Sequence, residues 1–170
     1  MEIFSSLDLM FSMRIGFSKD IHRTKAGVPL VLGGVKIPNE FGLESHSDGD
    51  CVTHAIVESI LGALALGGLG KFFPPSDDKY KNISSIYFLN EVKNILKKNH
   101  HKIGNIDVFI SCEKPKLSPY IEEMVKTVSQ ALEIEANRLS IKAGTNEKIG
   151  EVGRCEAIEA YSVCLLEEDL

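Results

Sequence analysis

Hydrophobic residues recur every three to four positions in three stretches of the chain, and this spacing predicts three helices. The stretches are 52–63, 84–98 and about 118–132. The first is apolar almost all round, so we expect it to be deeply buried, whereas the second has one apolar face and one polar face. Pro119 and Glu122 mark the start of the third, because proline and acidic residues favour the first helical turn.

Other stretches have the spacing or composition of β-strands. Residues 105–112 alternate between apolar and polar side chains, as a half-buried strand does, and 13–22 is short and extended in character. Residues 29–38 indicate two strands around a glycine bend, and further strands are expected at 139–143 and 154–166. The order of these elements predicts an α+β fold with a mixed or antiparallel sheet and helices on one face.

Two histidines and two aspartates gather where the first predicted helix begins, in the segment His46-Ser-Asp-Gly-Asp-Cys-Val-Thr-His54. Asp48 or Asp50 can accept hydrogen bonds from the free N–H groups of the first turn. The positive end of the helix dipole favours anions and a neutral His54, and neutral imidazole is the form that binds metals. His54 points away from the apolar stripe, toward Glu58. This helix end therefore suits a phosphate or a metal with its phosphate.

A second pair of candidate ligands lies in the first predicted strand. Asp20 and His22 are two residues apart, so in a strand they project from the same face. A catalytic zinc ion typically has three protein ligands, and His54 is the natural third. Taken alone, Asp20-x-His22 could be a surface pair and His54 a capping residue, so the hypothesis depends on the three coming together.

Composition limits the classes of function. The chain has 170 residues with 44% hydrophobic and 25% charged content, which is typical of one globular domain. A formal charge of −5 and the lack of a basic stripe argue against nucleic-acid binding, and no apolar run is long enough to cross a membrane. We interpret residues 1–12 as an N-terminal extension without the composition of a targeting signal, and 13–170 as the domain. Four cysteines without CxxC spacing indicate reduced thiols, and we expect a cytoplasmic protein.

Five separated motifs occur in an order and spacing that resemble the 2-C-methyl-D-erythritol 2,4-cyclodiphosphate synthase family. They are Asp20-x-His22, His46-Ser-Asp-Gly-Asp, His54, Ala-Leu-Gly-x-x-Gly-Lys-x-Phe-Pro and Thr145-x-Glu147-Lys148. The resemblance runs from Met13 to about Leu166. It implies a homotrimer with a channel on its three-fold axis and active sites between neighbouring subunits. It also implies a lyase of the non-mevalonate route to isoprenoid precursors, which releases CMP from a small nucleotide-linked substrate.

The resemblance assigns roles to individual residues. Asp20, His22 and His54 would hold Zn²⁺. His46 and Ser47 would hold the methylerythritol phosphate. Glu147 would bind Mg²⁺ or Mn²⁺ on the substrate diphosphate, which Thr145 would also contact. His46 and Thr145 are thus the candidate catalytic residues.

The remaining substrate contacts implied by the resemblance lie in loops. The loop Glu113–Leu117 would frame cytosine, with Pro115 and Lys116 among its residues. Gly68 and Gly70 belong to the stretch that meets the ribose. Arg154 would lie along the axial channel.

This sequence departs from the family pattern at two acidic positions. Gly68 and Pro75 stand where the family usually has aspartates that contact the ribose and the erythritol. Asp77 or Asp78 is our candidate for a partial substitute. We expect a raised KM rather than a loss of activity, because the metal ligands act on the reacting phosphates themselves.

Two other functions fit the same residues. A zinc-dependent phosphohydrolase would use the three metal ligands to activate water. A metal-binding trimer that has lost catalysis would keep zinc and turn nothing over.

Overall fold

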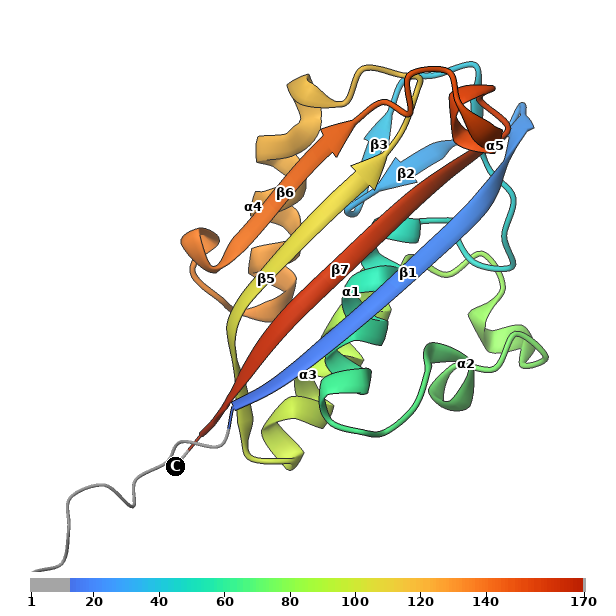
Figure 1. The fold of residues 1–170 in the computed structure, drawn as a ribbon. Helices are drawn as coiled ribbons and strands as arrows, with labels where there is room; N and C mark the ends of the chain where they lie inside the picture. The colour runs from blue at the N-terminus through green and yellow to red at the C-terminus, as the bar shows by residue number, and fades with distance from the viewer. Residues whose placement is uncertain (1–12, 170) are drawn as a thin grey trace, which may run out of the picture.

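The computed structural model of the protein describes residues 13–169 and contains a mixed five-stranded sheet (Figure 1). The strands are β1 (Met13–Ala26), β4 (Phe41–Leu43), β5 (His101–Ser111), β6 (Leu139–Gly144) and β7 (Ala157–Glu168), in the order β4-β1-β7-β5-β6. All neighbours are antiparallel except β5 and β6, which run parallel. The α+β class expected from the sequence is confirmed. Our interpretation of residues 1–12 as an extension concerns a segment outside the described residues.

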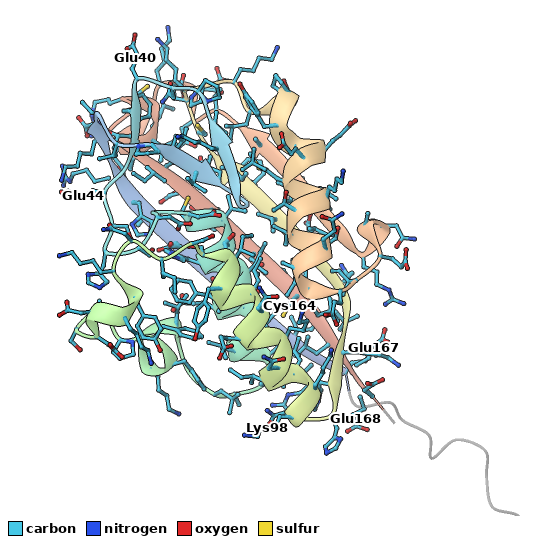
Figure 2. All side chains as sticks on the ribbon, turned by 180° about the vertical axis from the view of Figure 1, so that it is seen from behind. Glu40, Glu44, Lys98, Cys164, Glu167 and Glu168 are labelled. Atoms are coloured by element: carbon cyan, nitrogen blue, oxygen red, sulfur yellow. The ribbon has the colours of Figure 1, made fainter. Side chains whose placement is uncertain are left out.

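Three helices cover one face of the sheet (Figure 1). They are α1 (Cys51–Ala63), α3 (Ile86–Lys98) and α4 (Ile121–Leu132), and the view from behind shows α3 and α4 in front of the strands (Figure 2). A hairpin of β2 (Leu30–Leu32) and β3 (Val35–Ile37) lies at one end of this layer. Short helices occur at α2 (Leu69–Phe72) and α5 (Gly150–Gly153), with 3-10 turns at Asp78–Tyr80, Ser118–Tyr120 and Ala136–Arg138. Among the described residues, no helix has the length and apolar character needed to cross a bilayer.

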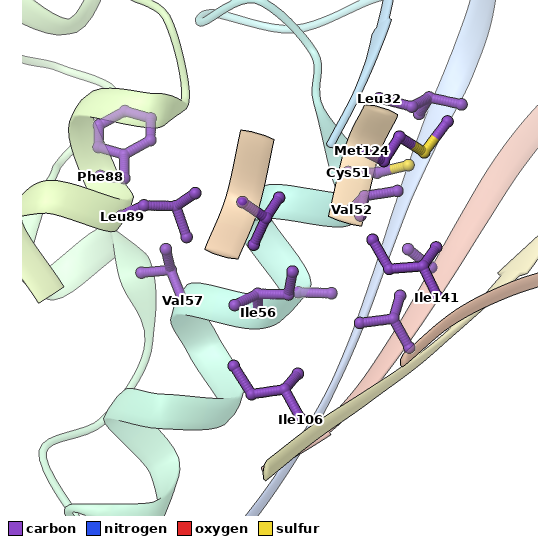
Figure 3. Packing of buried hydrophobic residues seen from close by; sticks show 14 of the residues in the cluster. Leu32, Cys51, Val52, Ile56, Val57, Phe88, Leu89, Ile106, Met124 and Ile141 are labelled. Carbon is purple, nitrogen blue, oxygen red and sulfur yellow. The ribbon is translucent and has the colours of Figure 1, made fainter. Parts of the chain in front are cut away.

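Helix α1 is the centre of the core, as its uniformly apolar sequence predicts. It packs against β1 and β7 on one side and against α3 on the other. Ile56 and Val57 are fully buried between Leu89 and the sheet (Figure 3). A Cβ atom at Gly16 of β1 would lie 1.8 Å from the carbonyl oxygen of Ser59, so only glycine allows the helix to approach this closely.

The element boundaries differ from the prediction in several places. β1 continues to Ala26 instead of ending at His22, and β5 begins at His101. A register shift between Ile103 and Asn105 breaks the alternation of β5, which explains why only its second half is visible in the sequence. The strand expected from Arg154 begins only at Ala157. β4, α2 and α5 were not predicted, because three or four residues are too short to show a periodicity.

The other face of the sheet carries exposed apolar side chains. Ile15 is 73% exposed and Phe17 64% exposed on β1, and Phe109 of β5 and Val163 of β7 lie in neighbouring register positions. Large apolar side chains in water are costly, and a contiguous group of them marks an interaction surface.

Candidate metal centre and active site

Three potential metal ligands come together where β1 passes the first turn of α1. Asp20 and His22 project from the face of β1 that meets the helices, and His54 follows three residues after the start of α1. Asp20 Oδ2 lies 3.0 Å from His22 Nε2 and 3.1 Å from His54 Nδ1, and the two nitrogens are 3.2 Å apart. The three residues therefore form the cluster that the sequence predicts, and it is a possible metal-binding site.

The chemistry and spacing of these atoms fit a zinc ion. Three ligand atoms about 2.0–2.1 Å from a tetrahedral ion would be roughly 3.3 Å apart, close to the separations observed here. The non-ligating nitrogen of His22, Nδ1, lies 3.2 Å from the carbonyl oxygen of Glu44. Donation from Nδ1 to this carbonyl leaves the Nε2 lone pair free to face the ion.

Charges in the cluster favour an ionised aspartate. Burial raises the pKa of the Asp20 carboxyl, but hydrogen bonds from His22 and His54 outweigh burial and bring its pKa below the ordinary value. For His22, burial lowers the pKa, while the hydrogen bond and charge of Asp20 raise it by more. The carboxylate is thus ready to bind a cation without first losing a proton.

Two aspartates organise the loop before α1. Asp50 is fully buried at the N-cap and accepts hydrogen bonds from Thr53 N at 3.0 Å, Gly33 N at 2.8 Å and Gly34 N at 2.6 Å. It therefore fixes the β2-β3 hairpin to the helix, and burial raises the pKa of its carboxyl. Asp48 accepts from Ser85 N at 2.7 Å, at the start of α3. Asp50 is thus the helix cap, and Asp48 joins two loops.

A pocket of about 270 Å³ opens beside the metal cluster. Its walls come from β1, the loop before α1, α1 itself, the α2 region and α3. The lining residues are Asp20, His22, Ser45, His46, Ser47, His54, Glu58, Leu69, Gly70, Phe73, Pro75, Tyr80 and Phe88. Part of the lining is thus polar and metal-binding in character, and the aromatic part, with Phe73, Tyr80 and Phe88, reaches His54, whose ring centroid lies 5.9 Å from that of Phe88.

His46 and Ser47 both line this pocket. His46 Nε2 is buried and has no hydrogen-bond partner among the described residues. A buried nitrogen without a partner is costly, and a ligand group in the pocket would satisfy it. Ser47 Oγ lies 3.2 Å from His54 Nε2 and 3.2 Å from Ser45 Oγ.

Glu58 lines the pocket as well, although sequence reasoning did not include it among the site residues. Its Oε1 accepts a hydrogen bond from Leu69 N at 3.0 Å, at the start of α2. The sequence signal that could have indicated Glu58 is its position one turn after His54, on the same side of α1.

The three predicted substrate residues from the α2 region and the turn after it have different outcomes. Gly70 lines the pocket, and Gly68 lies directly beneath the Glu58 carboxylate. Asp77 caps the Asp78–Tyr80 turn and does not line the pocket.

The other candidate substrate residues form a separate cluster at one edge of the sheet. Because β5 and β6 are parallel, the loops that follow them meet. Glu113 Oε2 accepts from Asn146 N at 3.2 Å, and Thr145 Oγ1 donates to Glu147 Oε1 at 2.8 Å. Lys116 is exposed nearby in sequence.

Within one chain this cluster does not reach the metal centre. β7 lies between β1 and β5 in the sheet, and none of Glu113, Pro115, Lys116, Thr145 and Glu147 lines the 270 Å³ pocket. Arg154 is also apart. It lies before β7, not within it, and forms a two-bond ion pair with Glu156 at 3.0 and 2.9 Å.

The fold and the site together define an α+β protein with a carboxylate–histidine centre of the kind found in metalloenzymes. The chain belongs to the YgbB family, whose model matches residues 13–167. The family resemblance inferred from the motifs is thereby confirmed.

Relatives and solved structures agree with this family. The chain is 49% identical over 158 residues to 2-C-methyl-D-erythritol 2,4-cyclodiphosphate synthase of Clostridium kluyveri, covering 93% of this chain and 96% of that one. It is 47% identical over 157 residues to the synthase of Nostoc punctiforme, covering 92% and 98%. The CDP complex of Plasmodium falciparum IspF matches with a TM-score of 0.83 and 37% identity, covering 94% and 98%. The bifunctional IspDF of Campylobacter jejuni matches with a TM-score of 0.89 and 33% identity, and this chain spans 43% of its length.

Proposed function

We propose that this protein is a 2-C-methyl-D-erythritol 2,4-cyclodiphosphate synthase. It converts 4-diphosphocytidyl-2-C-methyl-D-erythritol 2-phosphate to the cyclic diphosphate and CMP, in the non-mevalonate route. An oxygen of the 2-phosphate forms a bond to the β-phosphorus, and the bond between this phosphorus and the oxygen bridging to the α-phosphate breaks. That oxygen leaves with CMP. The observation that carries the proposal is the Asp20, His22 and His54 cluster in a chain 49% identical to a named synthase.

Asp20, His22 and His54 are the proposed ligands of zinc. A zinc ion held there supplies positive charge that draws electron density from a phosphoryl oxygen. The residues themselves hold three donor atoms toward one point and keep Asp20 ionised.

The other pocket residues position the substrate. His46 Nε2 and Ser47 Oγ line the pocket, where they can donate hydrogen bonds to the methylerythritol phosphate. Attack within one molecule needs little covalent help from the protein, and holding the reacting groups in line can supply roughly 7–11 kcal/mol of the acceleration. The aromatic wall with Phe73 and Phe88 excludes water, which limits hydrolysis.

We further propose that a second copy of the chain completes each active site. Glu147 would bind Mg²⁺ or Mn²⁺ on the diphosphate, Thr145 would contact the diphosphate, and the loop with Glu113, Pro115 and Lys116 would frame cytosine. These residues would come from a neighbouring subunit of a homotrimer. The distance of this cluster from the metal pocket within one chain supports the arrangement, as does the exposed apolar face of the sheet.

The axis of this trimer would carry a channel, with Arg154 along it. We also propose the extent of the synthase domain and the cellular location of the enzyme. Residues 13–170 would form the synthase domain, and the enzyme would be cytoplasmic. All four cysteines are free, which suits a reducing compartment.

A phosphorus NMR assay tests the function. Purified protein is incubated with the cytidine-linked methylerythritol 2-phosphate, Zn²⁺ and Mg²⁺, beside His54→Ala and the matched control His100→Asn. This control alters a histidine that follows the C-terminal end of α3 and does not line the pocket. We expect cyclic diphosphate and CMP from wild type and the control, and none from His54→Ala. Linear phosphate products would instead indicate a hydrolase. Bound zinc with no turnover would indicate a protein that has lost catalysis.

A further inference from the structure

Ser85 stands at the N-cap of α3 but does not cap it. The residue is completely buried, and its hydroxyl accepts no hydrogen bond from the first turn of the helix. A serine at this position usually accepts one from the backbone, which stabilises the helix by about 1 kcal/mol. The hydroxyl instead donates to the carboxylate of Asp48 and lies 3.0 Å from His54 Nε2.

The direction of these hydrogen bonds follows from the metal cluster. His54 Nδ1 faces Asp20 Oδ2 at 3.1 Å and His22 Nε2 at 3.2 Å, so a ligating His54 carries its lone pair on Nδ1 and its proton on Nε2. The Ser85 hydroxyl gives its proton to Asp48, which leaves an oxygen lone pair for the Nε2 proton. The chain of donation therefore runs from His54 to Ser85 to Asp48.

Asp48 is itself held in place by the two loops that it joins. Its carboxylate accepts from Ser85 N at 2.7 Å, and its own backbone N donates to Ile83 O at 3.2 Å. Asn82 N donates to His46 O at 2.9 Å in the same pair of loops. The Asp48 carboxylate, at which this series of hydrogen bonds ends, is therefore held in place by backbone contacts from both loops.

We propose that Ser85 and Asp48 are positioning residues for the metal centre. They fix the Nε2-protonated form of His54, hold its ring toward the ion and make Nδ1 a stronger ligand. Partners of this kind typically change metal affinity by about 10–100-fold. This inference rests on the metal site of the proposed function.

The second hydroxyl near His54, that of Ser47, has a different role. Ser47 Oγ is 3.2 Å from the same Nε2, but it has no carboxylate partner and it lines the pocket. Ser85 is held by Asp48 and does not line the pocket. Ser85 thus holds His54, which leaves the Ser47 hydroxyl free to meet substrate.

Zinc affinity, measured by competition with a chromophoric chelator, tests the assignment. We expect Ser85→Ala to bind zinc about 10–100-fold more weakly than wild type, and Asp48→Asn to be weaker as well. Ser84→Ala is the matched control, since Ser84 is exposed and its hydroxyl accepts only from Ile86 N at 3.4 Å. Ser84→Ala and Ser47→Ala should bind zinc as wild type does. If wild type binds zinc and Ser85→Ala binds it equally well, the positioning role is overturned while the metal site stands.

Nitrogen-15 NMR of the histidine rings adds a measurement whose deciding part uses the wild-type protein alone. In zinc-loaded wild type we expect His54 to carry its proton on Nε2, and in Ser85→Ala we expect that signal to shift or broaden. A proton on Nδ1 of zinc-loaded wild type would overturn the proposal outright. Failure of wild type to bind zinc would overturn the metal site, and this inference with it.

Discussion

The carboxylate of Glu58 occupies the space above Gly68. A Cβ atom at position 68 would lie 2.9 Å from Glu58 Oε1, the same oxygen that accepts a hydrogen bond from Leu69 N at 3.0 Å. Gly68 is the N-cap of α2 and has no side chain to cap it. Glu58 of α1 therefore performs the capping, and it places a carboxylate in the pocket wall at a point where the family usually has an aspartate.

This relationship predicts energetic coupling between the two positions. Glu58→Ala should destabilise the wild-type fold by about 1 kcal/mol, because Leu69 N loses its acceptor. In a Gly68→Asp background the same change should cost little, since the introduced carboxylate can cap α2 once that of Glu58 is gone. Urea unfolding of the four proteins measures the coupling, with Gly68→Ala as the control for added volume. Equal costs of Glu58→Ala in both backgrounds would contradict it.

Pro75 tests whether a departure from the family pattern affects substrate binding. It lines the pocket, at one of the two positions where the family resemblance implies an aspartate. Pro75→Asp should lower KM by up to about tenfold, the value of one hydrogen bond to a charged group, and change kcat by less. Pro75→Ala separates the loss of proline from the gain of a carboxylate. Steady-state kinetics on both variants decides the point, and an unchanged or higher KM in Pro75→Asp would argue against a missing contact here.

Much of the metal centre could be predicted because its residues follow local rules. Asp20 and His22 share a face through the two-residue period of a strand, and Asp50 caps α1 as its position suggests. The burial of His54 was underestimated. It points away from the apolar stripe, but β1 and α3 cover it, so it is only 8% exposed.

The remaining parts of the site depend on contacts between distant segments. The hydrogen bonds from Ser85 to Asp48 join residues 37 positions apart, and no periodicity reports them. Glu58 meets Gly68 only because α2 folds back along α1. Asp77 and Asp78, our candidate substitutes for a missing carboxylate, do not line the pocket, and the side chain of Asp77 caps a 3-10 turn instead.

Removing the metal should lower thermal stability. Zinc at about 100 times its dissociation constant stabilises the folded protein by about 2.7 kcal/mol, which is roughly 5–10 °C in unfolding temperature for a domain of this size. A chelator should abolish that gain in wild type, and Asp20→Asn should show no zinc-dependent shift. Asp78→Asn, on an exposed turn, should behave as wild type does. A full zinc response in Asp20→Asn would rule out Asp20 as a ligand.

An acid-sensitive contact joins α3 to α4. Hydrogen bonds from Lys93 and Lys97, at 2.8 and 2.9 Å, lower the pKa of Glu133 to about 2. A depressed carboxyl pKa stabilises the fold above the unfolded value of about 4.5, and this stabilisation is lost as pH falls from there toward 2. Carbon-13 NMR titration should therefore give a midpoint near 2 for Glu133. Glu133→Gln should lose stability less steeply in this range than wild type, and 1 M salt should reduce the difference because the pair is exposed.

The division of candidate residues between two clusters predicts that inactive variants can restore each other. His54→Ala removes a metal ligand and Glu147→Gln removes a carboxylate of the second cluster, so each should be inactive alone. If each site combines the metal pocket of one subunit with the Glu147 loop of another, random mixing of the two variants leaves about a quarter of the sites with both intact halves. Unfolding the two together and refolding them should therefore recover roughly that fraction of wild-type turnover.

A matched mixture separates this arrangement from a site contained in one chain. His54→Ala refolded with His22→Ala should stay inactive, because both changes damage the same half of every site. Phe17→Glu, on the exposed face of the sheet, should give a monomer by light scattering that binds zinc normally, because all three ligands lie in one chain. The monomer should not cyclise substrate, because the Glu147 loop of the same chain does not line its own metal pocket. An active Phe17→Glu monomer, or no recovery from the first mixture despite correct assembly, would show that one chain builds the whole site.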